Sequence, residues 1–237
     1  MMPMEFAVET VGLGRRFGRR WALAEVTLKV PRGARVMLTG RNGSGKSTLL
    51  RVVSSVLSPD RGTVRVSGHD VMEERESVRR QIALLSHSSG LYEALTALQN
   101  LQVAARFLGL DAGRPALLER LARFGLAPRA DDAVSTFSAG MRKRLALART
   151  MMQPAAVVLL DEPYGELDVD GFALVDGLLD TMRREGRTVL MSTHLLERGR
   201  ELCDHAVALE DGRLMWSGPA AELPLPAAWS ERQRGAA

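Results

Sequence analysis

The sequence has a single cysteine, Cys203, in 237 residues. One thiol cannot close an internal disulfide or build a cysteine-based metal cluster, so a disulfide-stapled secreted fold and a cysteine metal centre are both excluded. The cysteine usage agrees with a reducing compartment, and Cys203 is expected to be a small buried apolar residue.

Long apolar runs are missing as well. The longest uninterrupted aliphatic run, Ala155 to Leu160, falls far short of the roughly 20 residues that a membrane-spanning helix needs. The N-terminus carries Glu5 and Glu9 before any long apolar region, which does not fit a secretory signal. We therefore expect no membrane span and a cytoplasmic location.

There is no strong excess of one charge: the chain has 32 Lys and Arg residues and 28 Asp and Glu residues, which gives a formal net charge of +4. The arginines form short groups, such as 15–20 and 183–184, without the regular interleaving of aromatics that marks a nucleic-acid patch. These groups indicate a solvated face and no nucleic-acid partner. A contact with anionic lipid headgroups or an acidic partner surface stays open.

The hydrophobic content is 46%, enough for a full core in one domain, with or without a large insertion. Within it, one segment fits the phosphate-binding pattern G-x-x-x-x-G-K-[ST] at every fixed position. It consists of Gly40, Arg41, Asn42, Gly43, Ser44, Gly45, Lys46, Ser47 and Thr48.

Each residue type in this segment has a physical task. Glycines let successive backbone N–H groups converge on phosphate oxygens, and the following helix adds its positive end. Lys46 supplies a point charge for the β and γ phosphates, and the Ser47 hydroxyl suits Mg²⁺. The alternative is a Gly/Ser turn that happens to hold a lysine. A predicted buried strand over 35–39 and a predicted helix over 47–56 argue against it.

Short strands surround this loop in the sequence. Alternation over 23–30 predicts a strand that turns at 31–33 into the strand before the loop, and 63–66 predicts another strand, followed by a turn at 67–70. Together they form an N-terminal antiparallel layer. Phe17 ends a first strand, where its ring could stack on a purine base; the alternative is a core residue.

The middle of the chain is predicted to be helical. A buried strand over 82–86 ends in a polar segment that begins with His87, and Thr96 with Gln99 forms a capping box. Apolar residues then recur at helical spacing over 98–108 and 115–124. No strand pattern interrupts 91–134, so this stretch is predicted to be a helical insertion.

Two further segments carry candidate chemistry. Ser138 and Gly140 open a helix predicted to run through 141–152, with N–H groups free to face an anion. A buried strand over 155–160 then ends in Asp161 and Glu162, which point to alternate sides. Asp161 would hold the Mg²⁺ shell and Glu162 would polarise a water. The alternative is a pair of plain helix-capping acids.

The last third predicts a helix over 169–185, a strand over 188–192 and a hairpin whose two strands flank Asp211-Gly212. His194 follows the strand over 188–192. Because the carboxyl ends of parallel strands line one crevice, His194 is expected to meet Glu162 and the phosphate loop. The alternative is a histidine with a structural role.

This ordered set resembles the nucleotide-binding subunit of ATP-binding cassette (ABC) transporters over Val8 to Leu223. By that resemblance, the family's motifs fall as follows: Walker A at Gly40 to Thr48, the signature at Phe137 to Met141, Walker B at Val157 to Glu162, the D-loop at Gly165 to Asp168, the switch histidine at His194, and the adenine-stacking aromatic at Phe17.

The resemblance implies an α/β fold with a P-loop NTPase core, a mixed and mainly parallel sheet, an N-terminal antiparallel β layer and a helical subdomain insertion. The expected boundaries within one domain, 1–237, are a core at 1–90 and 153–223, a helical subdomain at 91–152 and a short tail at 224–237.

The resemblance also implies ATP hydrolysis with Mg²⁺, with Lys46, Glu162 and His194 as catalytic residues. Two cassettes would pair head to tail, as a homodimer, so that Ser138 and Gly140 act on the partner's ATP, with Asp168 also at the nucleotide. The helical insertion would dock on an integral membrane permease, which places the chain peripherally at the inner face of the cell membrane.

Two residues depart from the family pattern. Met141 replaces the glutamine of the signature, and His87 stands where a glutamine normally touches Mg²⁺ and relays closure to the permease. Imidazole changes its charge near neutral pH, so that contact would be sensitive to pH. The segment around His87, with Ser138-Ala139-Gly140, is similar to the ATPase subunit of the cytochrome c maturation haem exporter. A soluble cassette in iron–sulfur cluster assembly stays open as the alternative.

Overall fold

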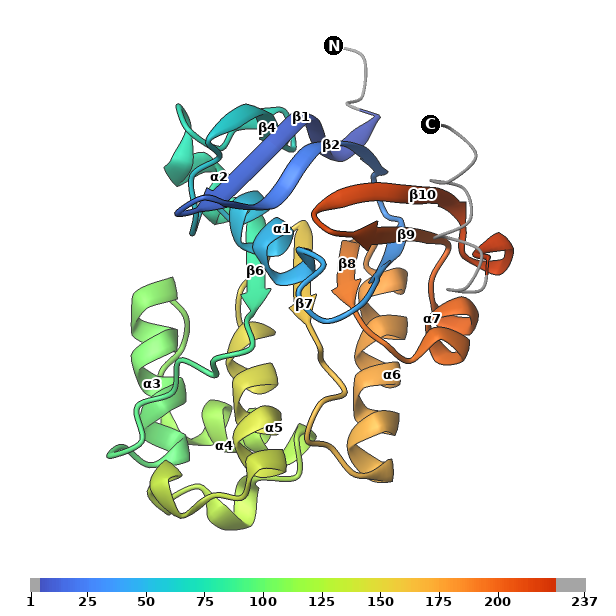
Figure 1. The fold of residues 1–237 in the computed structure, drawn as a ribbon. Coiled ribbons are helices and arrows are strands. Elements are labelled where there is room, and N and C mark those ends of the chain that lie inside the picture. Colours follow the sequence, from blue (N-terminus) through green and yellow to red (C-terminus); the bar gives the residue numbers. More distant parts are fainter. Residues whose placement is uncertain (1–4, 225–237) are drawn as a thin grey trace.

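The computed structural model describes residues 5–224, and its upper layer in Figure 1 is a four-stranded antiparallel sheet in the order β2-β1-β4-β5. Its strands are β1 (Phe6–Phe17), β2 (Arg20–Pro31), β4 (Arg61–Val66) and β5 (His69–Asp70). The first two strands form an antiparallel hairpin within the predicted N-terminal layer, with Phe17 opposite Arg20 at its tip.

A six-stranded sheet lies below it, in the order β10-β9-β3-β8-β7-β6. All of its neighbouring strands are parallel except β9 and β10, which form an antiparallel hairpin. The strands are β3 (Arg35–Thr39), β6 (Ile82–Leu85), β7 (Val157–Asp161), β8 (Thr188–Ser192), β9 (His205–Glu210) and β10 (Arg213–Pro219). The predicted fold class, a mainly parallel core sheet with an antiparallel layer, is confirmed.

Helices fill the space around the two sheets, and α3, α4 and α5 gather at the lower left of Figure 1. The helices are α1 (Lys46–Val53), α2 (Arg75–Gln81), α3 (Ala97–Leu108), α4 (Arg114–Arg123), α5 (Ala139–Thr150), α6 (Val169–Arg184) and α7 (Leu196–Leu202). Among the described residues, single 3₁₀ turns lie at Ala127–Arg129, Val134–Thr136 and Ala220–Glu222. Within residues 5–224, no helix combines the length and apolarity that crossing a membrane requires.

Two hydrophobic clusters hold these layers together. One joins both sheets through the buried face of α1, including Leu49, Leu50, Val52 and Val53. The other packs α3, α4, α5 and α6 against the opposite side of the six-stranded sheet, and Cys203 is buried there as expected. Burial raises the pKa of the Cys203 thiol to about 12. The capping box of Thr96 and Gln99 is also present at the start of α3.

Several element boundaries differ from the predictions. Helix α1 stops at Val53, three residues before the predicted end, because Ser55 takes a left-handed φ of 58° and breaks the helix. The predicted turn at 67–70 is shorter, because His69 and Asp70 pair with β4 as β5. Helices α2 and α7 were not predicted, because seven residues are too few to show a clear helical period.

The predicted division into a core (1–90, 153–223) and a helical subdomain (91–152) stays a prediction, and α3, α4 and α5 fall inside the latter range. The predicted tail, 224–237, lies outside the described residues except for its first residue. Within the range 91–134, which was predicted to lack strands, Thr96 and Ala133 form an isolated antiparallel bridge.

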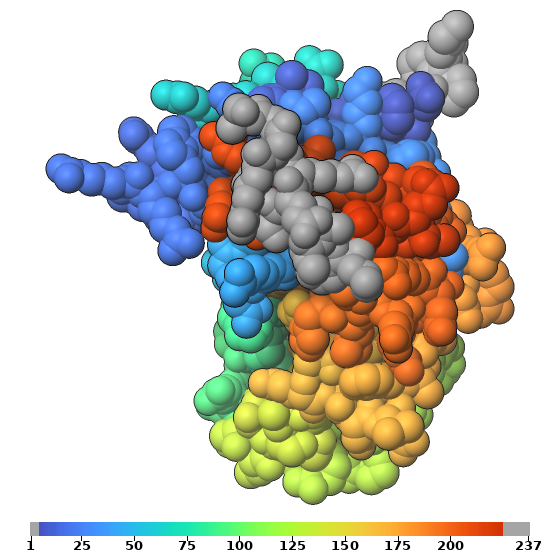
Figure 2. Space-filling model, turned by 45° about the vertical axis from the view of Figure 1, so that its right-hand side comes forward, coloured from blue at the N-terminus to red at the C-terminus, as the bar shows by residue number. Residues whose placement is uncertain are grey.

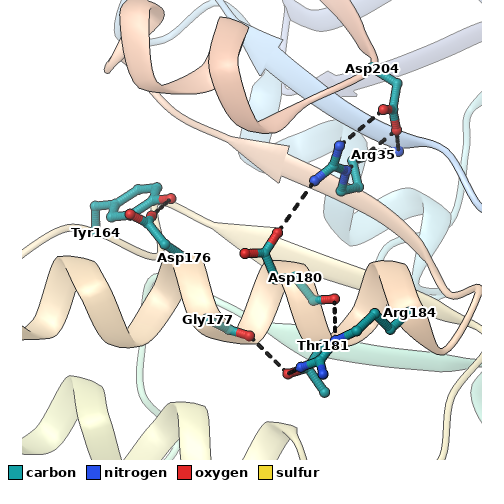
Figure 3. Close-up of polar contacts among 8 residues, drawn as sticks. All are labelled: Arg35, Tyr164, Asp176, Gly177, Asp180, Thr181, Arg184 and Asp204. Carbon is teal, nitrogen blue, oxygen red and sulfur yellow. Dashed lines mark hydrogen bonds and ion pairs between the residues drawn. The ribbon is translucent and has the colours of Figure 1, made fainter.

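Arg35 links three elements of the core sheet and its helices, as Figure 3 shows. Its side chain is 5% exposed, and Nη2 lies 3.0 Å from Asp204 Oδ1 while Nη1 lies 3.9 Å from Asp180 Oδ1. The Arg35 backbone N–H also donates to Asp204 Oδ2 at 2.9 Å. This one guanidinium therefore ties β3 to α6 and to the segment between α7 and β9.

Replacing Arg35 with methionine should lower the free energy of unfolding by about 2 kcal/mol and the melting temperature by about 4–8 °C, because the partly buried Asp204 carboxylate loses its guanidinium partner and keeps only the backbone N–H. Thermal melts followed by circular dichroism measure the change. Arg184→Met is the matched control, because Arg184 is exposed and its hydrogen bonds among residues 5–224 stay within α6, to Thr181 and the Asp180 carbonyl. Equal melting temperatures for the two variants would contradict the prediction.

Candidate functional site

The phosphate loop connects the end of β3 to the start of α1. Gly40, Gly43 and Gly45 all have positive φ values of 139°, 79° and 107°. A Cβ on Gly40 would lie 2.1 Å from the Leu209 carbonyl oxygen, and one on Gly45 would lie 2.5 Å from the Ala22 carbonyl oxygen. Backbone conformation and close packing against β9 and β2 therefore both require glycine here.

Two side chains of the loop, those of Lys46 and Ser44, carry polar groups that could bind an anion. Lys46 Nζ donates to the carbonyl oxygens of Gly40 at 2.8 Å and Arg41 at 3.1 Å. Burial lowers the pKa of Lys46, although Glu162 and Asp161 act in the opposite direction. Ser44 Oγ is buried and has no hydrogen-bond partner within the described residues. A loop that curls around a polyanion would satisfy such a buried hydroxyl, so the loop fits the phosphates of a nucleotide.

Asp161 lies at the end of β7, directly opposite the start of α1. Its side chain is buried, and its Oδ1 accepts hydrogen bonds from Ser47 Oγ at 3.0 Å and Ser192 Oγ at 2.7 Å. Hydroxyl and carboxylate oxygens are the donors that Mg²⁺ prefers. The described part of the chain has no group of three or more His, Cys, Asp or Glu that could hold a metal by itself. Ser47 and Asp161 therefore fit Mg²⁺ bound together with phosphate oxygens.

Glu162 leaves the strand with a left-handed φ of 48° and faces a different partner. Its Oε2 lies 3.0 Å from His194 Nδ1, and the exposed fractions of the two side chains are 25% and 72%. The Glu162 backbone N–H donates to Ser192 Oγ at 2.9 Å, which fixes the start of its loop to β8. The carboxylates of Asp161 and Glu162 are adjacent in sequence but contact different side chains, Ser47 and Ser192 for Asp161 and His194 for Glu162, which the helix-capping alternative does not explain.

The first residues of the phosphate loop meet Glu162 and His194 at one cleft of about 770 Å³. The cleft is lined by Gly40, Arg41, Asn42, His87, Lys143, Glu162, Gly165, Glu166 and His194. The structure therefore brings the phosphate loop together with Glu162 and His194, as the strand ends predicted, and His87 lines the same cleft, as the family resemblance implied. His87 is exposed at this cleft.

Lys143 and Glu166 belong to this cleft but were not singled out from the sequence. Lys143 is 9% exposed, and its Nζ lies 3.5 Å from the Asp161 carbonyl oxygen. Burial lowers the pKa of Lys143, while Glu166, Asp161 and Glu162 act to raise it. In sequence Lys143 stands between Arg142 and Arg144 on one helix, and only its burial distinguishes it from them.

The predicted signature residues face a second hollow of about 630 Å³. Ser138 caps α5 by accepting from the Met141 N–H at 3.2 Å, and a Cβ on Gly140 would lie 2.9 Å from the Glu166 carbonyl oxygen. Asp168 caps α6 and lies 2.7 Å from Arg144 Nη2. Ser138, Gly140 and Asp168 line this second hollow and are not among the residues that line the nucleotide cleft of the same chain.

Phe17 is the last residue of β1, opposite Arg20 at the turn of the β1–β2 hairpin, and it is 50% exposed. Figure 2 shows a blue segment near the N-terminus projecting from the molecule at the left. The core alternative is therefore wrong for this residue. The Arg15 guanidinium carbon lies 5.0 Å from the ring centroid, so one face of the ring already has a cation close by. Thr48, the remaining predicted loop residue, is half-buried in the first turn of α1.

Known proteins share this arrangement. The sequence profile of the ABC transporter family matches residues 23–165. A daunorubicin resistance ATP-binding protein of Streptomyces coeruleorubidus is 39% identical over 219 residues, which are 92% of this chain and 69% of that protein. The ABC transporter ATP-binding protein NatA of Bacillus subtilis is 34% identical over 83% of this chain and 81% of its own length.

Solved structures agree with these sequence matches. The ATP-binding subunit of an ABC transporter superposes with a TM-score of 0.81 at 29% identity, over 97% of this chain and 93% of that one. A dimeric ATP-binding cassette in a post-hydrolysis state with ADP and phosphate gives 0.82 at 26% identity, over 90% and 98%. The fold, the phosphate loop and these matches have one explanation: the chain belongs to the ABC transporter family, as an ATP-binding subunit with ATPase activity.

Proposed function

We propose that this chain hydrolyses ATP at the cleft between the phosphate loop, Glu162 and His194, and that hydrolysis drives export through a membrane permease. The observation that carries the proposal is the pairing of Ser47 with Asp161 and of Glu162 with His194, each at 3.0 Å, beside one phosphate loop. A site that only binds nucleotide would not need a carboxylate beside a histidine at its rim.

The roles follow from the groups present. Lys46 and the loop N–H groups would hold the β and γ phosphates, and Ser47, Asp161 and His87 would face the Mg²⁺ that accompanies ATP, which neutralises phosphate charge when bound. Glu162 would accept the proton of the attacking water, and His194 would orient the γ phosphate. Phe17, half exposed at its hairpin tip, would stack on the adenine ring.

The signature residues support a paired arrangement. Ser138 and Gly140 line a hollow separate from their own chain's nucleotide cleft, so they would reach a phosphate only on another cassette. The post-hydrolysis structure that this chain resembles is a dimer. We therefore propose a head-to-tail homodimer in which Ser138, Gly140 and Asp168 contribute to the partner's site.

Export is the transport direction that the relatives favour. Their names refer to daunorubicin resistance in Streptomyces and to Nod factor export in Bradyrhizobium diazoefficiens. Haem export for cytochrome c maturation is the narrower proposal; it rests on His87 and Ser138-Ala139-Gly140, and none of the relatives named here carries that description. The permease would hold the chain at the inner face of the membrane.

Purification of the tagged chain in mild detergent tests the proposal. The expected result is that a multi-span membrane protein co-purifies and raises the ATPase rate. Recovery of an active ATPase with iron–sulfur assembly proteins, and without a membrane partner, would instead support the soluble alternative and overturn the transport proposal.

His87→Gln tests the role of the unusual residue at the cleft. Glutamine, like neutral imidazole, can accept or donate one hydrogen bond, so basal ATPase activity should stay within about threefold of wild type. Phosphate release by the purified chain measures it. A complete loss of activity would show that His87 performs chemistry that an amide cannot.

A further inference from the structure

A polar and aromatic cluster lies next to the Glu162–His194 pair and joins three elements. Tyr164 follows Glu162 by two residues, Asp176 lies on α6, and Arg198 lies in the first turn of α7. The Tyr164 hydroxyl donates to Asp176 Oδ1 at 2.7 Å, and Arg198 Nη1 donates to Asp176 Oδ2 at 2.5 Å. Figure 3 shows Tyr164 turned toward Asp176 over α6. One carboxylate thus binds a side chain from the loop after Glu162 and a side chain from α7.

Aromatic packing reinforces these two bonds. The Tyr164 and Phe172 rings are 5.2 Å apart in an edge-to-face arrangement, and the Arg198 guanidinium carbon lies 5.5 Å and 5.0 Å from their centroids. Tyr164 is only 4% exposed. Its burial, reinforced by the bond to Asp176, raises the pKa of Tyr164, so the hydroxyl remains a hydrogen-bond donor.

The cluster connects directly to both members of the pair. The Gly165 N–H donates to the Glu162 carbonyl at 3.1 Å, which closes a tight turn with Tyr164 inside it. The Leu196 N–H donates to the His194 carbonyl at 3.0 Å, which joins His194 to the start of α7, two residues before Arg198. The backbone positions of Glu162 and His194 are thereby tied to Tyr164 and Arg198.

Helix α7 also packs tightly against the core sheet. A Cβ on Gly199, the neighbour of Arg198, would lie 2.0 Å from Met37 Sδ on β3. The His194 side chain is 72% exposed, so the backbone that carries it largely sets its place. A shift of α7 relative to α6 would therefore change the separation of His194 and Glu162.

We propose that Tyr164, Asp176 and Arg198 are positioning residues that hold Glu162 and His194 at the spacing ATP hydrolysis needs. The inference rests on the proposed roles of Glu162 and His194. None of the three lines the nucleotide cleft, so they act on turnover and leave ATP binding to the phosphate loop. Misplacement of reacting groups by about 1 Å can cost on the order of 100-fold in rate.

Arg198→Met tests the proposal, because methionine keeps most of the apolar stem and removes the charge that binds Asp176. The expected result is a fall in kcat of at least about tenfold, with KM for ATP within about threefold of wild type. Arg198→Lys should recover most of the lost kcat. Tyr164→Phe removes only the hydroxyl that bonds Asp176, and it should also lower kcat. This variant tests the proposal if Arg198→Met does not fold.

Two measurements separate positioning from general destabilisation. Arg184→Met, an exposed arginine on α6, should keep wild-type kcat. Arg198→Met combined with Glu162→Gln should still form a dimer with ATP, which shows that folding and nucleotide binding survive. Wild-type kcat in both Arg198→Met and Tyr164→Phe, while Glu162→Gln abolishes hydrolysis, would overturn the inference. Hydrolysis that persists in Glu162→Gln would instead overturn the proposed roles of the pair.

Discussion

Glu162→Gln is expected to lower steady-state ATP hydrolysis by at least about 100-fold and to trap an ATP-bound dimer. Glutamine has nearly the same size and can still hydrogen-bond His194, which lies 3.0 Å from the carboxylate in the wild-type chain. It cannot take a proton from water. ATP therefore stays intact between two cassettes, and the step that separates them does not occur.

Size-exclusion chromatography with light scattering, with and without ATP, measures the trapped dimer, and phosphate release measures the rate. The control combines Glu162→Gln with Lys46→Met in one chain, which should remain monomeric at ATP concentrations that saturate the single Glu162→Gln variant, because its ATP binding is much weaker. A Glu162→Gln variant that stays monomeric with ATP would contradict the proposed head-to-tail dimer. Near-normal hydrolysis would show that another group activates the water.

Lys46→Met is expected to weaken ATP binding by at least about 100-fold, a loss of about 2.7 kcal/mol. Methionine fills the space of the lysine stem but brings no charge. Lys46 faces Asp161 and Glu162, both of which favour its charged form. Without the ammonium group, residue 46 no longer offsets the repulsion between the triphosphate and the carboxylates of Asp161 and Glu162.

Isothermal titration calorimetry with ATP measures the affinity directly. Lys46 Nζ also bonds two carbonyl oxygens of the free loop, so the melting temperature without nucleotide serves as a check on folding. Arg51→Met is the matched control, because Arg51 lies in the last turn of the same helix and outside the residues that line the cleft. Wild-type affinity in Lys46→Met would show that Lys46 does not contribute to ATP binding and would contradict its proposed role.

Local patterns predicted a large part of this protein. The phosphate loop is readable because positive φ values favour glycine at three positions within six residues, and close packing also requires it at Gly40 and Gly45. The cap of α3 at Thr96 and the two-residue turn at Asp211-Gly212 are equally local, and both are present. The carboxyl ends of β7 and β8 were also readable, because these buried runs stop at the polar residues Asp161 and Ser192.

Other features depend on contacts that the sequence does not encode locally. The burial of Lys143 beside the cleft distinguishes it from Arg142 and Arg144, which share its helix and its charge. The exposure of Phe17 depends on how its hairpin projects from the sheet. Helices α2 and α7 are short and are held by the layers around them, so their own periodicity is weak.

The sequence by itself determined the chemistry of the loop, the order of the motifs and the α/β class, because each depends on residue type and on spacings of a few residues. The tertiary structure decided which side chains meet. Ser47 and Asp161 are 114 residues apart in sequence and 3.0 Å apart in space. Arg198 and Asp176, 22 residues apart, are joined only because α6 and α7 pack beside the same sheet. Such contacts follow from the balance of packing over the whole chain, and no local pattern records them.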